Sequence, residues 1–199
     1  GTLDEASLAA QLARRPVFAS AATYEPFGLA VLEAALKGGW QVAVIDHASG
    51  HAVPDGVLEV GGVDLTDSAQ AQKAVDAVIA RFGRLDSLLN IAGGFVWQTT
   101  DDAAPAWDRM FALNLSTALH ASRAALPHLK ASDAGRIVNV GSAAALKAGA
   151  GMGAYGASKA AVHALTQSLA LALAPRIRVA GIGPGPALPS PRQSEEQFR

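Results

Sequence analysis

Residues 135–185 read GRIVNVGSAAALKAGAGMGAYGASKAAVHALTQSLALALAPRIRVAGIGPG. The β-branched run at 136–140 is typical of a buried strand, and the long alanine- and leucine-rich stretch at 154–173 indicates a helix. A second β-branched run at 177–182 follows Pro175 and predicts another strand. A strand, a helix and a strand in this order predict a parallel βαβ unit.

The same alternation extends toward the N-terminus. We expect further strands at 17–21, 40–45, 57–63 and 85–91, and helices at 3–14, 27–36, 68–82 and 106–126, the last stopped by Pro127. Strands alternating with helices predict a doubly wound parallel sheet in a three-layer α/β/α, Rossmann-like fold. At 199 residues we expect one domain over 1–199, with a helical extension at 1–15 and an irregular tail at 184–199.

The composition excludes several classes of function. A formal net charge of -1 offers no basic surface for nucleic acid or an anionic membrane. The absence of cysteine excludes disulfides, thiolate metal sites and cysteine nucleophiles, and the histidines lack metal-ligand spacing with partner acids. No apolar run reaches the ~18 residues that cross a membrane, and residues 1–15 do not have the pattern of a signal peptide. We therefore expect a cytoplasmic protein that binds no metal and acts on a small molecule.

Tyr155 and Lys159 are the first candidates for catalysis. Residues four apart share one face of a helix, so the phenol and the ammonium are expected side by side. A neighbouring cation favours the charged form of a phenol, which suits it to general acid–base catalysis. The alternative is a tyrosine packed on the aliphatic stem of the lysine.

Three other positions carry polar or small residues at sites where a ligand is expected. Ser142 follows the strand at 136–140, where its hydroxyl can bind a substrate oxygen or simply cap a turn. Asn114 lies in an apolar helix, which suggests a specific hydrogen bond, although it can also face solvent. The small residues from Asn90 to Gly93 allow a flat ligand to approach the backbone, or form a plain turn.

These stretches together resemble the single-domain branch of the short-chain dehydrogenase/reductase family. The resemblance covers roughly 17–185 and rests on Asn114 and on the segments FGRLDSLLNIAGG, GRIVNVGS, AYGASK and IRVAGIGPG. It implies an NAD(P)-dependent oxidoreductase that moves a hydride between nicotinamide and a carbonyl or alcohol. Tyr155 would then be the general acid/base, and Lys159 would assist it and hold the ribose hydroxyls. Ser142 would orient the substrate oxygen, and Asn114 would hold a water in a proton relay.

The resemblance also implies where the cofactor lies. Asn90, Ala92 and Gly93 would line the adenosine side, and Pro184 with Gly185 would border the nicotinamide. Asp64 and Leu65, after the third predicted strand, resemble the position that contacts adenine.

The glycine-rich loop of the family is altered in this chain. Residues 21–28 read AATYEPFG, so of the three motif glycines only Gly28 remains, and Pro26 removes a backbone donor. A phosphate site at this helix start would have to be rebuilt. We expect it to use Thr23 and the amides around Phe27 and Gly28.

Asp46 favours NAD(H) over NADP(H). It ends the strand at 40–45, where a carboxylate can bind both hydroxyls of the adenosine ribose and would repel a 2′-phosphate. No lysine or arginine follows closely to receive that phosphate. An ordinary polar strand end is the alternative.

The sequence ends at Arg199, well before the usual length of the family, so a substrate-covering segment after Gly185 would be missing or truncated. The helices at 106–126 and 154–173 would still pair subunits in a homodimer or homotetramer. Four further residues are substrate-pocket candidates by position: Phe95, Trp97, Lys147 and Met152. The alternative for Trp97 is that it packs its loop onto the core.

Two alternative functions remain open. The altered loop suits a catalytically impaired family member that acts as a binding or partner subunit, although the retained serine, tyrosine, lysine and asparagine argue against it. An epimerase or dehydratase of the extended branch shares the tyrosine–lysine pair but needs a larger C-terminal domain. The identity of the substrate is not specified by the sequence.

Overall fold

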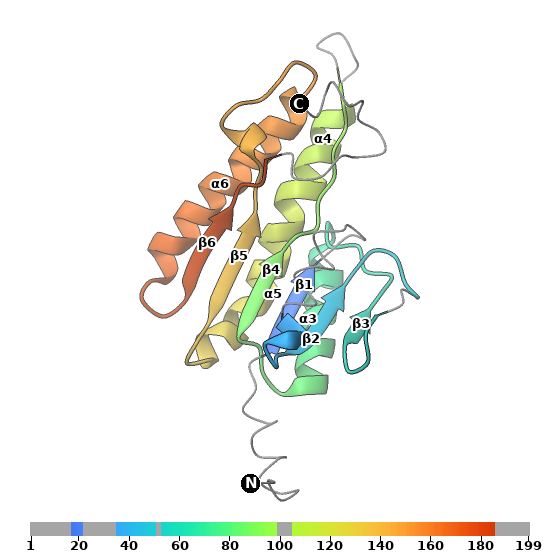
Figure 1. Cartoon of the computed structure of the whole chain (residues 1–199), viewed down its shortest axis with the longest axis vertical. Helices are drawn as coiled ribbons and strands as arrows, with labels where there is room; N and C mark the ends of the chain where they lie inside the picture. The colour runs from blue at the N-terminus through green and yellow to red at the C-terminus, as the bar shows by residue number, and fades with distance from the viewer. Residues whose placement is uncertain (1–16, 22–34, 51–52, 99–104, 186–199) are drawn as a thin grey trace, which may run out of the picture.

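The computed structural model describes residues 17–21, 35–50, 53–98 and 105–185 (Figure 1). The predicted N-terminal helix, most of the predicted helix at 27–36, the glycine-loop residues Thr23, Phe27 and Gly28, and the tail from 186 onward lie outside these residues.

Six parallel strands form one sheet in the order β3-β2-β1-β4-β5-β6 within the described residues. They are β1 (Val17–Ala21), β2 (Gln41–Ile45), β3 (Leu58–Val60), β4 (Ser87–Asn90), β5 (Arg136–Val140) and β6 (Arg178–Ile182). All six predicted strands are confirmed, each lying inside its predicted range. The strand order reverses between β1 and β4, which is where such sheets bind ligands beyond the ends of their strands. We call that end of the sheet the carboxyl edge and the opposite end the amino edge.

Helix α3 (Ser68–Phe82) has the predicted bounds because both of its ends are specified locally. The Asp67 side chain accepts hydrogen bonds from the backbone amides of Ala69 and Gln70, which caps the first turn. Gly83, with φ of 74°, ends the helix in the left-handed conformation that glycine tolerates best. Four of its residues are buried against the core: Ala71, Ala74, Val75 and Val78.

The predicted helix at 106–126 differs from prediction in two ways. It consists of α4 (Pro105–Phe111), a π-helical turn η1 (Ala112–Ser116) and α5 (Thr117–Ala131). The expectation that Pro127 ends it is wrong, because α5 continues to Ala131. An internal proline costs about 3 kcal/mol, but Leu129 beyond it is fully buried in the core, and burying such a side chain contributes about 1.5–3 kcal/mol.

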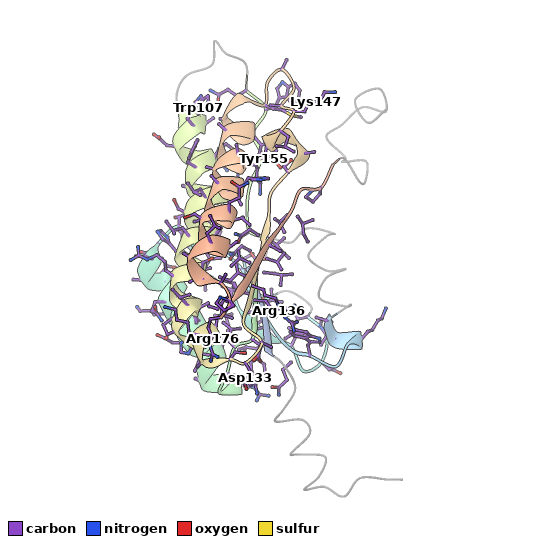
Figure 2. The ribbon with its side chains drawn as sticks, turned by 90° about the vertical axis from the view of Figure 1, so that its left-hand side faces the viewer. Trp107, Asp133, Arg136, Lys147, Tyr155 and Arg176 are labelled. Atoms are coloured by element: carbon purple, nitrogen blue, oxygen red, sulfur yellow. The ribbon has the colours of Figure 1, made fainter. Side chains whose placement is uncertain are left out.

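Helices α3, α5 and α6 (Gly153–Leu173) lie on one face of the sheet (Figure 2). The main core fills the space between this helical layer and the strands and includes Leu88, Leu129 and Ile177. A second, smaller cluster centred on Val42 covers the other face, with Ala35, Leu36 and Trp40 packed against it. The fold is the predicted doubly wound α/β class. Within the described part of the chain, no helix has the length and apolarity needed to cross a bilayer.

Candidate active site

The π-helical turn η1 places Asn114 against the segment that follows β4. Its Oδ1 accepts a hydrogen bond from the Gly94 amide (2.9 Å), and its Nδ2 donates to the Gly94 carbonyl (3.0 Å). A Cβ on Gly93 would lie 2.5 Å from Asn114 Oδ1, and one on Gly94 would lie 2.8 Å from Leu113 Cδ1. The glycines after β4 therefore leave room for side chains of η1. π-turns of this kind often occur at functional sites.

Asn114 also connects η1 to helix α6 through Ser158. Asn114 Nδ2 donates to Ser158 Oγ (2.9 Å), and Ser158 Oγ donates to the Tyr155 carbonyl (2.8 Å). Asn114 and Ser158 are both buried, at 1% and 0% exposure. The two side chains therefore fix the turn of α6 that carries Tyr155 relative to the end of β4.

Lys159 reaches from α6 to the carboxyl edge of the sheet. Its Nζ donates to the carbonyl of Val140, the last residue of β5, at 2.9 Å. A Cβ on Gly93 would lie 3.3 Å from the same Nζ, so the ammonium also borders the segment after β4. The side chain is only 5% exposed. The structure thus places a buried cation at the ends of two neighbouring strands.

Tyr155 lies one helical turn before Lys159 on α6 and is half-buried. Within the described part of the chain, its hydroxyl has no hydrogen-bond partner. The Phe95 ring packs edge-to-face against the Tyr155 ring, with centroids 4.9 Å apart and an interplanar angle of 83°. The phenol is therefore held by its ring and leaves its oxygen available.

Ser142 follows β5 and caps the short 3-10 helix η2 (Ala143–Ala145). Its Oγ accepts a hydrogen bond from the Ala144 amide (3.2 Å), so the capping alternative is realised. That bond uses an acceptor site of the hydroxyl, and its hydrogen can still be donated elsewhere. The Ala143 amide donates to the Pro184 carbonyl (2.9 Å), which brings the segment after β6 beside Ser142. Gly185, which follows Pro184, is exposed.

Asp46 and Asp64 lie beyond the ends of β2 and β3. Asp46 is 2% exposed, and its Oδ1 accepts from the Ala48 amide (3.0 Å). Asp64 Oδ1 accepts from the amide (2.8 Å) and the hydroxyl (2.7 Å) of Thr66. These two hydrogen bonds hold the pKa of Asp64 below its usual range, and the bond from the Thr66 hydroxyl has the larger effect. The Leu65 side chain is buried in the core, and its carbonyl lies 3.2 Å from His120 Nδ1, so the predicted contact with adenine would fall to the backbone.

The Asn90 side chain belongs to a buried polar network. Its Nδ2 donates to Ser122 Oγ on α5 (3.0 Å) and to Asn139 Oδ1 on β5 (2.7 Å). Asn139 in turn donates to Thr166 Oγ1 on α6 (2.9 Å). The predicted role of Asn90 in lining the adenosine side would therefore fall to its backbone, together with Ala92, which is half-buried against the core.

The weaker pocket candidates lie at the same edge. Trp97 is 55% exposed, and a Cβ on Gly151 would come within 2.4 Å of its indole. Met152 precedes α6, and its carbonyl accepts from the Gly156 amide (2.7 Å). Lys147 is exposed beyond η2, at the same end of the molecule as Tyr155 (Figure 2).

Two features of this site were not anticipated from sequence. Ser158 is one of them, although a serine next to Lys159 in an alanine- and leucine-rich helix is a usable signal. The π-turn has no local sequence signature that we identified. Among the described residues, no three histidine, aspartate or glutamate side chains gather into a metal-binding group.

The carboxyl edge fits a nicotinamide dinucleotide in its chemistry. The strand order reverses there, between β1 and β4. A buried carboxylate, Asp46, suits the hydroxyls of one ribose, and a buried ammonium, Lys159, suits those of the other. The two groups lie at the ends of different strands, as an extended two-ribose ligand requires.

Comparison with known proteins is consistent with this geometry. A profile of the family described as short chain dehydrogenase matches residues 23–198. Over 168 residues the chain is 37% identical to 2-(S)-hydroxypropyl-CoM dehydrogenase 3 of Xanthobacter autotrophicus, covering 79% of this chain and 66% of the relative. Over 174 residues it is 33% identical to D-beta-hydroxybutyrate dehydrogenase of Rhizobium meliloti, again covering 79% of this chain and 66% of the relative. The chain thus spans less than two thirds of the length of these relatives.

Among solved structures, the chain is similar to a 3-ketoacyl-(acyl-carrier-protein) reductase from Brucella melitensis complexed with NADH. The TM-score is 0.79 at 28% identity, and the match covers 85% of this chain and 75% of the reductase.

Proposed function

We propose that this chain, which belongs to the short-chain dehydrogenase family, is an oxidoreductase that transfers a hydride between a nicotinamide dinucleotide and a carbonyl or alcohol. One observation carries the proposal: the Tyr155 hydroxyl, which has no hydrogen-bond partner within the described residues, belongs to the helical turn before buried Lys159 at the carboxyl edge of the sheet. The relatives named above are called dehydrogenases of a hydroxypropyl and a hydroxybutyrate compound, and alcohols of this kind fit the proposed chemistry.

In the direction of reduction, Tyr155 donates its phenolic proton to the carbonyl oxygen. When bound, the nicotinamide supplies the hydride to the carbonyl carbon, so that the carbonyl becomes an alcohol as NADH becomes NAD⁺. Ser142 donates a hydrogen bond to the same oxygen and stabilises its developing negative charge. Lys159, one helical turn further along α6, carries the positive charge that would balance the negative charge left on the Tyr155 oxygen after proton transfer. The reverse sequence oxidises the alcohol.

Asn114 acts in this proposal by positioning other groups. Its amide holds Gly94 and Ser158, and Ser158 holds the main chain of Tyr155. The water relay from Asn114 to Lys159 remains a prediction. Asn114 Oδ1 and Lys159 Nζ lie close to each other, because both atoms border the position that a Cβ on Gly93 would take.

NAD(H) is the cofactor that we propose in preference to NADP(H). The support is Asp46, whose carboxylate at the end of β2 would bind ribose hydroxyls and repel a 2′-phosphate. The remaining predicted contacts, from Thr23, Phe27 and Gly28 to Pro184 and Gly185, belong to the same proposal.

We also propose that the chain forms a homodimer or homotetramer through α5 and α6. The support is the outer face of α6, where Leu171 is 85% exposed although it is a large apolar side chain. The measurement is the molar mass in solution by light scattering.

The substitution Tyr155→Phe tests the proposed chemistry. It removes the proton donor and keeps the ring that packs on Phe95. We expect turnover with NAD(H) to fall by about 10²–10⁴, while NADH binding, followed by its fluorescence, stays unchanged. A variant that turns over at the wild-type rate would show that Tyr155 is not the acid/base.

A further inference from the structure

Three aromatic rings form a continuous row beside the proposed reaction centre. Phe95 lies in the middle: its ring packs edge-to-face on Tyr155 (4.9 Å) and on Trp97 (6.3 Å, interplanar angle 62°). Phe95 and Trp97 follow Gly94, the residue that Asn114 holds on both its amide and its carbonyl. We call Tyr155, Phe95 and Trp97 the aromatic row. It extends from the tyrosine proposed to transfer the proton to two exposed aromatic rings.

The row is open to solvent although its side chains are apolar. Phe95 is 47% exposed and Trp97 is 55% exposed. Exposed aromatic rings grouped at one place favour contact with an apolar partner, because covering them removes apolar surface from water.

The two segments that carry the aromatic row contain few charged residues. Residues 87–98 contain no charged side chain, and 141–159 contain only Lys147 and Lys159. The Lys159 ammonium is buried and bonded to the Val140 carbonyl, and Lys147 is exposed beyond η2. These two segments therefore offer few charged groups to a heavily hydroxylated substrate.

Trp97 is held in place by the loop before α6. The Gln98 amide donates to the Gly151 carbonyl (2.9 Å), and Gly151 has φ of 77°. A Cβ on Gly151 would lie 2.4 Å from Trp97 Cε2, so only a glycine lets the indole lie flat against this loop. An exposed ring that is already fixed loses little conformational entropy when a ligand covers it.

We infer that the aromatic row binds an apolar ring of the substrate, so that the chain acts on aryl or alicyclic ketones and their secondary alcohols. The ring stacks on Phe95 and Trp97, and the carbonyl lies within reach of the Tyr155 hydroxyl. Phe95 and Trp97 are then the residues that select the substrate. This inference rests on the proposed function.

A pair of substrates and a pair of variants test the inference. Acetophenone carries an apolar ring, and dihydroxyacetone is a ketone without one. We expect wild-type kcat/KM to favour acetophenone, and Trp97→Ala to lower its kcat/KM by about tenfold or more. The same variant should leave dihydroxyacetone within about twofold, because the reacting groups are untouched.

Trp107→Ala is the matched control. Trp107 on α4 is 45% exposed and stacks on Phe111 instead of the row (6.5 Å, 21°). We expect its kcat/KM for acetophenone to stay within about twofold of wild type. A preference for dihydroxyacetone, or equal losses in both tryptophan variants, would overturn the inference.

A binding measurement decides the inference independently of turnover. The chain has 3 tryptophans, and Trp97→Phe removes only the one in the row while keeping a flat ring. We expect 1-phenylethanol to change the tryptophan fluorescence of the wild type and to leave that of Trp97→Phe unchanged. An identical response in both proteins contradicts the inference. If the chain binds 1-phenylethanol through Trp97 but shows no Tyr155-dependent turnover, the proposed function fails and the ring-binding surface stands.

Discussion

The two edges of the sheet use polar side chains in opposite ways. At the amino edge, the buried Asp86 carboxylate accepts from Arg84 Nε (2.9 Å), Arg84 Nη2 (2.7 Å) and Ser132 Oγ (2.5 Å). At the carboxyl edge, the Tyr155 hydroxyl has no partner within the described residues, and the Ser142 hydroxyl keeps its hydrogen free. The amino edge uses these groups to hold the chain together, whereas the carboxyl edge keeps the Tyr155 hydroxyl and the Ser142 hydrogen available for a ligand.

The contrast follows from the construction of a parallel sheet. All strands end at the same edge, so the loops there are free to vary while the opposite edge is fixed by short connections. The Arg136 amide donates to the Asp86 carbonyl (2.9 Å), and the Arg178 amide donates to the Gly135 carbonyl (3.0 Å), which aligns the starts of β4, β5 and β6. A substitution at the amino edge should therefore cost stability, and one at the carboxyl edge should cost turnover.

At the carboxyl edge, Ser142→Ala should have a large effect on turnover, second to that of Tyr155→Phe. Loss of the hydroxyl should lower kcat by about 10²–10³, because it removes one donor to the developing oxyanion. The unfolding free energy should fall by only about 0.5–1 kcal/mol, because the lost cap serves the short helix η2. Steady-state kinetics and urea unfolding measure the two effects, with Ser168→Ala on the exposed face of α6 as the control. A stability loss without a rate loss would make Ser142 structural.

Arg84→Met should lower stability and leave turnover unchanged. Asp86 is 1% exposed, so removal of the arginine leaves a buried carboxylate without its cation. We expect the unfolding free energy to fall by about 2–3 kcal/mol, less than for a fully buried pair because Arg84 is 40% exposed. The kcat of the folded protein should not change. Arg81→Met, which removes an exposed arginine over the Phe82 ring, is the control for urea unfolding. Equal stability of the two variants would contradict the account of the amino edge.

Gly93→Ala should lower both the stability of the fold and the rate of turnover. The new methyl would lie 2.5 Å from Asn114 Oδ1 and 3.3 Å from Lys159 Nζ, so both side chains would have to move. We expect a loss of about 1–3 kcal/mol in unfolding free energy, together with loss of turnover. Gly149→Ala is the control, because its nearest neighbour would be Met152 Sδ at 3.8 Å. If Gly93→Ala were as active and as stable as the wild type, the close packing of Asn114 and Lys159 against Gly93 would not be required.

The smallest effect concerns pH and Asp64. Its folded pKa is lowered by the Thr66 hydrogen bonds, so the carboxylate stabilises the fold above the unfolded pKa of about 3.9. That contribution is lost as the pH falls through the lowered folded value. Thr66→Val should therefore lower the unfolding free energy at pH 7 by at most about 1 kcal/mol, and the difference from wild type should narrow at pH 3. A pH-independent difference in urea midpoints would assign the effect to something other than Asp64.

The strands and α3 were predictable because their signals are local. Short apolar runs mark all six strands, and Asp67 with Gly83 marks both ends of α3. The grouping of Tyr155, Lys159 and Ser142 at one edge was also predictable, since each follows or faces the end of a strand.

The features that were missed depend on packing between distant segments. The continuation of α5 past Pro127 depends on the burial of Leu129 against the sheet. The aromatic row depends on the fit of Trp97 against Gly151. Neither contact can be read from the residues around it, because the partner lies elsewhere in the chain.

The central claim is that the carboxyl edge holds a nicotinamide dinucleotide for chemistry at Tyr155. It is tested most directly by fluorescence titration of the purified chain with NADH and, separately, with NADPH. We expect saturable binding in the micromolar range, with NADH bound more tightly because the proposed contact with Asp46 would repel a 2′-phosphate. Absence of binding for both nucleotides would contradict it.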